Sequence, residues 1–198
     1  MIHTLTDIDT WLFLKLNAGA ANPVLDWLMP IATELRYYLP VIVVGLLALA
    51  IFGGGKGRSA VLIAILLIIT TDQLASHLIK PLVGRVRPCH VVAGARVLYR
   101  CGKTLAFPSG HATSTMAAAI FFGLLYRRWL WPLVALSVLI SYSRVYLGIH
   151  YPLDMLGGWV LGGGLALGAA WLYRAHLARQ LNRWRLFRTD PVAGGASP

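Results

Sequence analysis

The sequence has little charge, and acidic residues are especially scarce. Charged residues make up 13% of the 198 residues, and Asp and Glu together number 7. A soluble globular domain carries about one quarter charged residues. The chain therefore has too little polar surface to be covered by water. The same composition excludes a soluble disordered, fibrous or disulfide-scaffold protein.

The remaining composition is hydrophobic and basic. Residues of the AVILMFWYC set make up 58%, and the 18 Lys and Arg residues give a net charge of +11. Mean hydropathy is +0.67. An integral membrane protein fits these values, and its basic surplus can orient loops, contact anionic headgroups or bind an anionic substrate. We expect no nucleic-acid partner.

Five windows have the length and apolarity of transmembrane helices, for which about 20 residues are needed. They are residues 37–55, 59–79, 104–126, 129–149 and 155–173. Transmembrane strands would alternate polar and apolar residues, and these windows do not. The sequence therefore predicts an all-α, polytopic membrane helix bundle with five transmembrane helices in a single domain over residues 1–190.

The N-terminal segment, residues 1–36, contains short apolar stretches interrupted by polar residues and prolines. Its first ten residues include Asp7 and Asp9 and no Lys or Arg, so the positive start of a cleavable signal peptide is missing. We expect two interfacial helices on the outer face. A sixth transmembrane helix is the alternative.

Basic residues indicate which ends of the helices face the cytoplasm. Residues 53–58, 126–129 and 174–190 are rich in Lys or Arg, which predicts a cytoplasmic location. Residues 174–190 fit either a helix lying on the anionic inner leaflet or an ordinary solvated helix. Residues 191–198 are expected to be disordered. The outer side then receives the loop 80–107, whose own basic residues suggest a bound anionic substrate.

Three polar clusters fall at the outer side. The first has three cations in eight residues, Lys80, Arg85 and Arg87, which also fit a membrane-edge anchor. The second, residues 107–111, predicts a helix N-terminus at Ser109 and Gly110 whose free backbone N–H groups could bind phosphate. A simple capped helix start is the alternative.

The third cluster contains Arg144, His150 and Asp154. Pro152 fits the first turn of a helix, which lets the Asp154 carboxylate reach back to a ring nitrogen of His150. Such a pair fixes the tautomer and makes the other ring nitrogen a better nucleophile. The alternative is a helix-capping Asp beside an interfacial His.

Together the clusters would form one cationic site at the outer end of the bundle. No group of Asp, Glu, His or Cys has the spacing of a divalent-metal site, so we expect neither a metal nor another cofactor. An anion with concentrated charge fits best, and phosphoryl transfer is the chemistry that suits it.

The patterns Lys-x6-Arg-Pro from Lys80, Pro-Ser-Gly-His over residues 108–111 and Ser-Arg-x5-His-x3-Asp from Ser143 resemble the three motifs of the type-2 phosphatidic acid phosphatase superfamily. The resemblance implies a metal-independent phosphatase in which His150 attacks phosphorus, Asp154 orients it and His111 protonates the leaving oxygen. The phosphate-binding groups would be Lys80, Arg87, Ser109, Gly110 and Arg144, with Arg85 as a possible further ligand.

Around the third motif the sequence looks most similar to the bacterial undecaprenyl diphosphate phosphatases. This implies an enzyme of the bacterial inner membrane that converts undecaprenyl diphosphate to undecaprenyl phosphate at the periplasmic or exterior face. Lipid A, phosphatidylglycerophosphate and phosphatidate are alternative substrates, because their phosphatases share the motifs. A non-catalytic protein that binds or transports anionic lipids is a different class, and the complete set of His111, His150 and Asp154 argues against it. The sequence does not indicate an oligomeric state.

Two further features concern packing. Cys89 and Cys101 lie in the outer loop, where an oxidising compartment favours a disulfide over two free thiols. In the fifth window, small-residue faces at four-residue spacing predict close helix contact within the bundle rather than in a dimer. These residues are Gly158, Gly162, Gly164 and Gly168.

Overall fold

The computed structural model describes residues 2–186, and over this range it is all-α, as the sequence predicts. The N-terminal helices are α1 (Ile2–Asn17) and α2 (Pro23–Thr33), followed by α3 (Leu35–Phe52) and α4 (Gly54–Gln73). A π-helical turn, Leu74–Ile79, and the short helices α5 (Lys80–Val83) and α6 (Pro88–Val91) lead into the outer loop. Then come α7 (Gly110–Leu125), a 3-10 turn (Arg127–Trp129), α8 (Leu130–Tyr146) and α9 (Pro152–Leu186).

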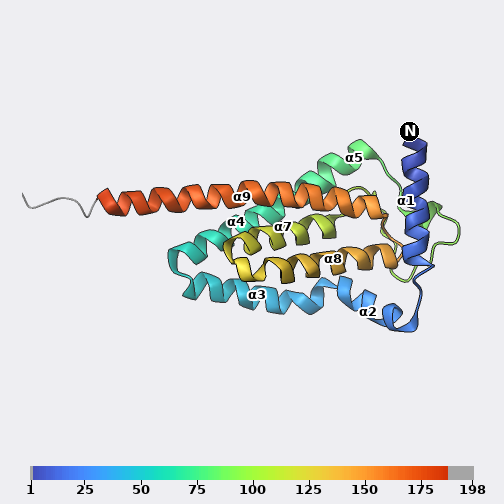
Figure 1. Cartoon of the computed structure of the whole chain (residues 1–198), viewed down its shortest axis with the longest axis horizontal. Coiled ribbons are helices and arrows are strands. Elements are labelled where there is room, and N and C mark those ends of the chain that lie inside the picture. The colour runs from blue at the N-terminus through green and yellow to red at the C-terminus, as the bar shows by residue number, and fades with distance from the viewer. Residues whose placement is uncertain (1, 187–198) are drawn as a thin grey trace, which may run out of the picture.

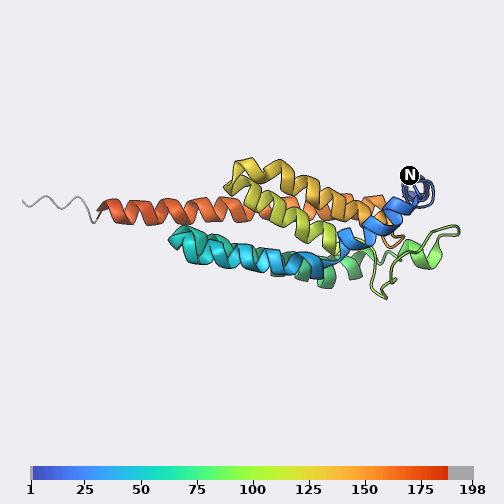
Figure 2. The same cartoon turned by 90° about the horizontal axis from the view of Figure 1, so that it is seen from below.

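Five helices, α3, α4, α7, α8 and α9, run along the length of the molecule as a bundle (Figure 1 and Figure 2). They correspond to the five predicted windows. In the described part of the chain, α3, α9 and the run from α4 to α6 are long and apolar enough to cross a membrane, and α7 is a shorter apolar helix. With 17 residues, α8 is about 25 Å long, less than the hydrocarbon thickness of about 30 Å. The count of five spans therefore stays a prediction.

The core of the bundle lies where α7 packs against α4 and α9. Phe121 and Ala117 of α7 are buried against alanines of α4 and α9, such as Ala60 and Ala166. These small side chains let the helices approach closely, which is the usual basis of helix packing in lipid. In contrast, α3 buries no residue, and its mean hydropathy of 2.1 suits a surface that faces lipid.

Glycines bring α9 into contact with α7. A Cβ atom on Gly162 would lie 2.1 Å from the carbonyl oxygen of Thr113, and one on Gly158 would lie 2.8 Å from the Ala112 Cβ. The predicted close contact within the bundle is therefore confirmed at these two positions. At Gly164 and Gly168 a Cβ would have nothing within 4 Å. This second pair lies on another face of α9, because two residues turn an α-helix by about 200°.

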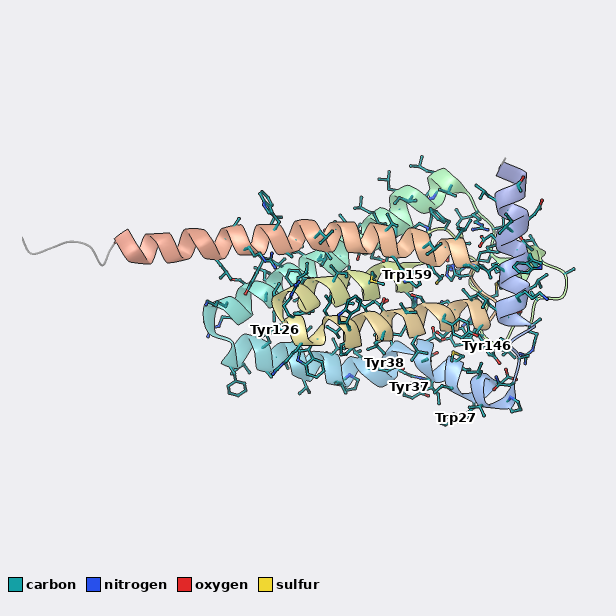
Figure 3. The ribbon with its side chains drawn as sticks, in the orientation of Figure 1. Trp27, Tyr37, Tyr38, Tyr126, Tyr146 and Trp159 are labelled. Atoms are coloured by element: carbon teal, nitrogen blue, oxygen red, sulfur yellow. A yellow bond between two sulfur atoms is a disulfide. The ribbon has the colours of Figure 1, made fainter. Side chains whose placement is uncertain are left out.

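The two N-terminal helices lie at one end of the bundle. Helix α1 crosses this end nearly at right angles to the bundle axis (Figure 1 and Figure 2). Its Phe13 is fully buried and packs on the Tyr151 ring with 5.5 Å between centroids. Tyr146, labelled near α2 in Figure 3, donates a hydrogen bond of 2.5 Å to Asp26. This arrangement favours interfacial helices over a sixth span.

Helix α9 differs from the prediction at its C-terminal half. The sequence separated a span over residues 155–173 from a tail beginning at residue 174, but the structure has one helix from Pro152 to Leu186 that projects past its neighbours (Figure 1). No Gly or Pro occurs between residues 174 and 186 to interrupt it. The tail predicted to be disordered, residues 191–198, lies outside the described residues.

Candidate active site

The three predicted clusters meet at the end of the bundle crossed by α1. The Arg87 guanidinium lies 3.1 Å from His150 Nε2, which joins the first cluster to the third. His111 interacts electrostatically with Arg144, His150 and Arg87, which joins the second cluster to both. The Lys80 charge interacts with Arg87, Arg144 and Asp154.

The His150 and Asp154 pair forms as the sequence predicts. Pro152 begins α9, so Asp154 is its third residue, and its Oδ2 accepts the Tyr151 N–H at 2.8 Å and lies 3.2 Å from His150 Nδ1. Burial, reinforced by the charges of Arg87 and Arg144, lowers the pKa of His150 well below its usual range. The ring is therefore neutral at pH 7.

The tautomer of His150 follows from its neighbours. A guanidinium can only donate hydrogen bonds, so Nε2, which faces Arg87, must accept. The ring proton then lies on Nδ1 and is donated to Asp154. The single lone pair of Nε2 therefore points to the side of the cations, where it accepts the hydrogen bond from Arg87.

A glycine shapes the turn that leads to His150. Gly148 has φ +84°, a left-handed conformation that L side chains rarely adopt. A Cβ there would lie 2.3 Å from the carbonyl oxygen of Arg96, in the outer loop. Only glycine lets the loop and the turn pack together here.

Arg87 is held in place by the outer loop and by the turn. Its Nε donates to the Thr104 carbonyl at 2.7 Å, and one terminal nitrogen donates to Thr104 Oγ1 at 2.8 Å. The other terminal nitrogen donates to the Ile149 carbonyl at 3.2 Å and faces His150. The guanidinium is thus fixed beside the nucleophilic nitrogen.

Arg144 and Ser109 supply polar atoms that no protein group uses. Arg144 is 8% exposed, and one terminal nitrogen donates to Thr33 Oγ1 at 2.8 Å. Among the described residues, its Nε and the Ser109 Oγ are buried without a hydrogen-bond partner. Burying such groups without a partner is costly, so both atoms suit an anion.

The start of α7 lies beside these atoms. The backbone N–H of Ser109 donates to the Asp154 carbonyl at 3.0 Å, which ties the α7 N-terminus to the first turn of α9. A Cβ on Gly110, the first residue of α7, would meet nothing within 4 Å. The backbone thus has open space beside Gly110, and the first N–H groups of a helix have no partner within it, as an anion site requires.

The π-helical turn Leu74–Ile79 ends directly before Lys80. Such turns change the direction of the following residues and often occur at functional sites. Lys80 is largely buried, and its charge interacts with both site arginines and with Asp154. The turn thus presents a lysine from a membrane-length helix to the cationic cluster.

Arg85 occupies a different place from the other cations. One terminal nitrogen donates to Asp154 Oδ1 at 2.9 Å, and the other donates to Asp9 Oδ2 at 2.5 Å. The hydrogen bonds of its two terminal nitrogens therefore go to carboxylates. The sequence did not predict three residues that contact the site arginines, because they lie outside the motifs: Asp9, Thr33 and Thr104. Only Asp9 gave a signal, as an acidic residue in an apolar helix.

The outer loop is closed by a disulfide between Cys89 and Cys101, which are 12 residues apart. Within the described part of the chain, these cysteines and His90 form one group with three potential metal ligands. Two sulfurs bonded to each other do not offer thiolates, so this group does not suit a metal. The bridge lies between Arg87 and Thr104 in sequence, close to the contacts that hold the guanidinium.

The fold and the site together define a multi-pass membrane protein with a cationic anion-binding site around a histidine. A family described as the PAP2 superfamily matches residues 61–178, which covers all three clusters. The chain belongs to the PAP2 superfamily and is a membrane lipid phosphatase.

Several relatives match this sequence over most of its length. A lipid A 4'-phosphatase of Bacteroides thetaiotaomicron is 35% identical over 98% of this chain and 87% of its own length. The undecaprenyl-diphosphatase BcrC of Bacillus subtilis is 34% identical over 71% of this chain and 70% of its own. The crystal structure of Aquifex aeolicus LpxE aligns with a TM-score of 0.63 and 25% identity, covering 80% of this chain and 92% of that one.

Proposed function

We propose that the chain removes phosphate from a membrane lipid in two steps, through a phosphohistidine at His150. The observation that supports this most is the state of the ring, with Nδ1 donating to Asp154 and the lone pair of Nε2 on the side of Arg87. A neutral, oriented imidazole is a competent nucleophile.

In the first step, His150 Nε2 bonds to phosphorus while the bond from phosphorus to the lipid oxygen breaks. His111 donates a proton to the leaving oxygen. The negative charge on the transferring group is stabilised by Arg87, Arg144 and Lys80 together with the donors of Ser109 and Gly110. Phosphoryl transfer depends chiefly on this electrostatic stabilisation.

In the second step, a water molecule attacks phosphorus and the bond to His150 Nε2 breaks. His111, now neutral, accepts the proton of the attacking water. Inorganic phosphate leaves, and both histidines return to their starting states. In this scheme fixed cations do the work of a divalent metal, so we propose that the reaction needs none.

We propose lipid A as the first candidate substrate, with undecaprenyl diphosphate as the second. This reverses the order expected from the third motif, because the lipid A 4'-phosphatase of B. thetaiotaomicron matches nearly the whole chain. Undecaprenyl diphosphate is the second candidate, favoured by the similarity to BcrC. We propose that the site faces the outside of the inner membrane, since the basic connections lie at the other end.

The test is a phosphate-release assay of the purified protein in detergent with EDTA. Lipid A, undecaprenyl diphosphate, phosphatidate and phosphatidylglycerophosphate are compared, with His150→Ala as the control. Release that is fastest from lipid A and absent in the variant supports the proposal. Binding of these lipids without release from any of them would instead indicate a binding or transport protein.

A further inference from the structure

One buried acidic residue of the site comes from outside the family motifs. Asp9 of α1 is 2% exposed, although it belongs to a helix that lies across the end of the bundle. We propose that Asp9 is a positioning residue for catalysis, which acts on the His150 and Asp154 pair through Arg85. This inference rests on the proposed function and adds a residue to it.

The first support is a continuous chain of charged contacts. His150 Nδ1 lies 3.2 Å from Asp154 Oδ2, and Asp154 Oδ1 accepts from Arg85 at 2.9 Å. The other end of the Arg85 guanidinium donates to Asp9 Oδ2 at 2.5 Å. Two carboxylates thus hold the two ends of one planar guanidinium, which fixes its orientation.

The second support is a direct contact of Asp9 with the helix that carries Asp154. Asp9 Oδ1 accepts the backbone N–H of Leu153 at 2.9 Å. Leu153 is the second residue of α9, so this N–H has no partner within the helix. Asp9 therefore completes the start of α9 from another part of the chain, directly beside Asp154.

The charges of Asp154, Arg85 and Asp9 explain why a second carboxylate is useful. Arg85 alone would neutralise Asp154 and weaken its effect on His150. With Asp9 present, two negative charges and one positive charge leave a net negative charge beside the imidazole. The His150 ring becomes positive as Nε2 bonds to phosphorus, so this net charge stabilises the transition state.

Burial raises the pKa of Asp9, and the hydrogen bond from Arg85 opposes that shift. The contact with Arg85 thus favours the charged form of Asp9, which the contacts from Asp9 through Arg85 to Asp154 require.

Helix α1 is fixed firmly enough to hold Asp9 in place. Asn17, at its C-terminal end, is fully buried and donates to the carbonyls of Tyr146 at 2.6 Å and Arg96 at 2.8 Å. Its Oδ1 accepts the Arg96 N–H at 2.7 Å. Phe13 packs on the Tyr151 ring, and the Arg85 guanidinium lies 3.9 Å above that ring's centre.

The experiment compares Asp9→Asn with wild type in detergent, using steady-state kinetics and pH profiles. The variant keeps one oxygen that can accept the Leu153 N–H, and it loses both the charge and the acceptor that faces Arg85. We expect kcat to fall by about 10- to 100-fold, the range seen when the partners that orient a histidine are removed, with KM unchanged. The groups that face His150 are Asp154, Arg87, Arg144, Lys80 and His111. Because these remain, the acidic limb of kcat/KM should move to lower pH, as expected when a negative charge near an imidazole is removed.

Two further variants separate positioning from a general loss of structure. Asp7→Asn is the matched control, because Asp7 is exposed on the same helix, and it should keep wild-type kinetics. Adding Asp9→Asn to Arg85→Gln should lower kcat no further than Arg85→Gln alone. Two outcomes would show a structural role only and overturn the inference. One is an additive loss of kcat in the double variant. The other is an Asp9→Asn variant with a lower kcat, a lower melting temperature and an unchanged pH profile. Wild-type kinetics in Asp9→Asn would also overturn it. An inactive wild type overturns the proposed function itself, and the inference with it.

Discussion

The contact between α7 and α9 leads to a prediction that the structure makes quantitative. In Gly162→Ala, the new Cβ would lie 2.1 Å from the Thr113 oxygen, 3.0 Å from the Thr113 carbonyl carbon and 3.1 Å from the Ala117 nitrogen. All three are backbone atoms, so no side chain can rotate away. Ordinary contact begins at about 3.4 Å. The two helices must therefore separate by more than about 1 Å, at a cost of about 1–3 kcal/mol, the range for overpacking a core.

Gly164→Ala is the matched control, because its Cβ would meet nothing within 4 Å. Both substitutions bring the same gain in helix propensity, about 1 kcal/mol, so their difference isolates the packing term. For a chain of this size we expect Gly162→Ala to melt roughly 2–12 °C below Gly164→Ala in detergent. Thermal unfolding followed by tryptophan fluorescence measures this difference.

Activity should change as well. Thr113 lies one turn after Ser109 and Gly110 on α7, so a shift of this helix displaces the phosphate-binding groups. A misplacement of about 1 Å can cost about 100-fold in rate. We expect a lower kcat in Gly162→Ala and wild-type kcat in Gly164→Ala. Equal melting temperatures and equal rates for the two variants would refute the close contact of α7 and α9.

Further predictions concern the chemistry and the outer loop. His150→Ala should abolish turnover, and an acid-labile, alkali-stable phosphoryl-enzyme should be trapped on wild type; full activity in the variant would exclude the mechanism. His111→Ala should slow lipid substrates far more than activated aryl phosphates, which need no proton on the leaving group. Because burial lowers the pKa of His150, the acidic limb of kcat/KM should lie below about pH 6.5, and a limb above that value contradicts a neutral nucleophile. Activity should survive EDTA and be inhibited by vanadate, whereas restoration by magnesium would point to a metal. Mass spectrometry of the unreduced, alkylated protein should show Cys89 joined to Cys101, and losing the bridge should cost at most about 3 kcal/mol; two alkylated cysteines would contradict it.

The sequence predicted those parts of the site that depend on local geometry. Asp154 reaches His150 because a proline starts a helix two residues before Asp154, and this can be read from five consecutive positions. The all-α fold follows from the length of the apolar windows. Residues that lie far apart along the chain gave no such signal. Asp9 and Leu153 are 144 residues apart, and no periodicity or spacing relates them.

Helix boundaries were predicted less well, for a physical reason. The apolar windows give the part of a helix that suits lipid, whereas helix ends depend on backbone capping and on breaking residues. Helix α9 therefore continues past the apolar window to Leu186 without a break. Helix α8 ends at Tyr146, before the end of its window, where Gly148 forms the turn.

The position of α1 has a practical consequence for handling the protein. Asp9 is the eighth residue of α1, the helix that lies across the site end of the bundle (Figure 1). A tag or fluorescent protein attached ahead of α1 would pull on the helix whose Asp9 holds Arg85. The end of α9 lies at the opposite end of the molecule from α1 (Figure 1). Tags for purification and imaging therefore belong at the C-terminus.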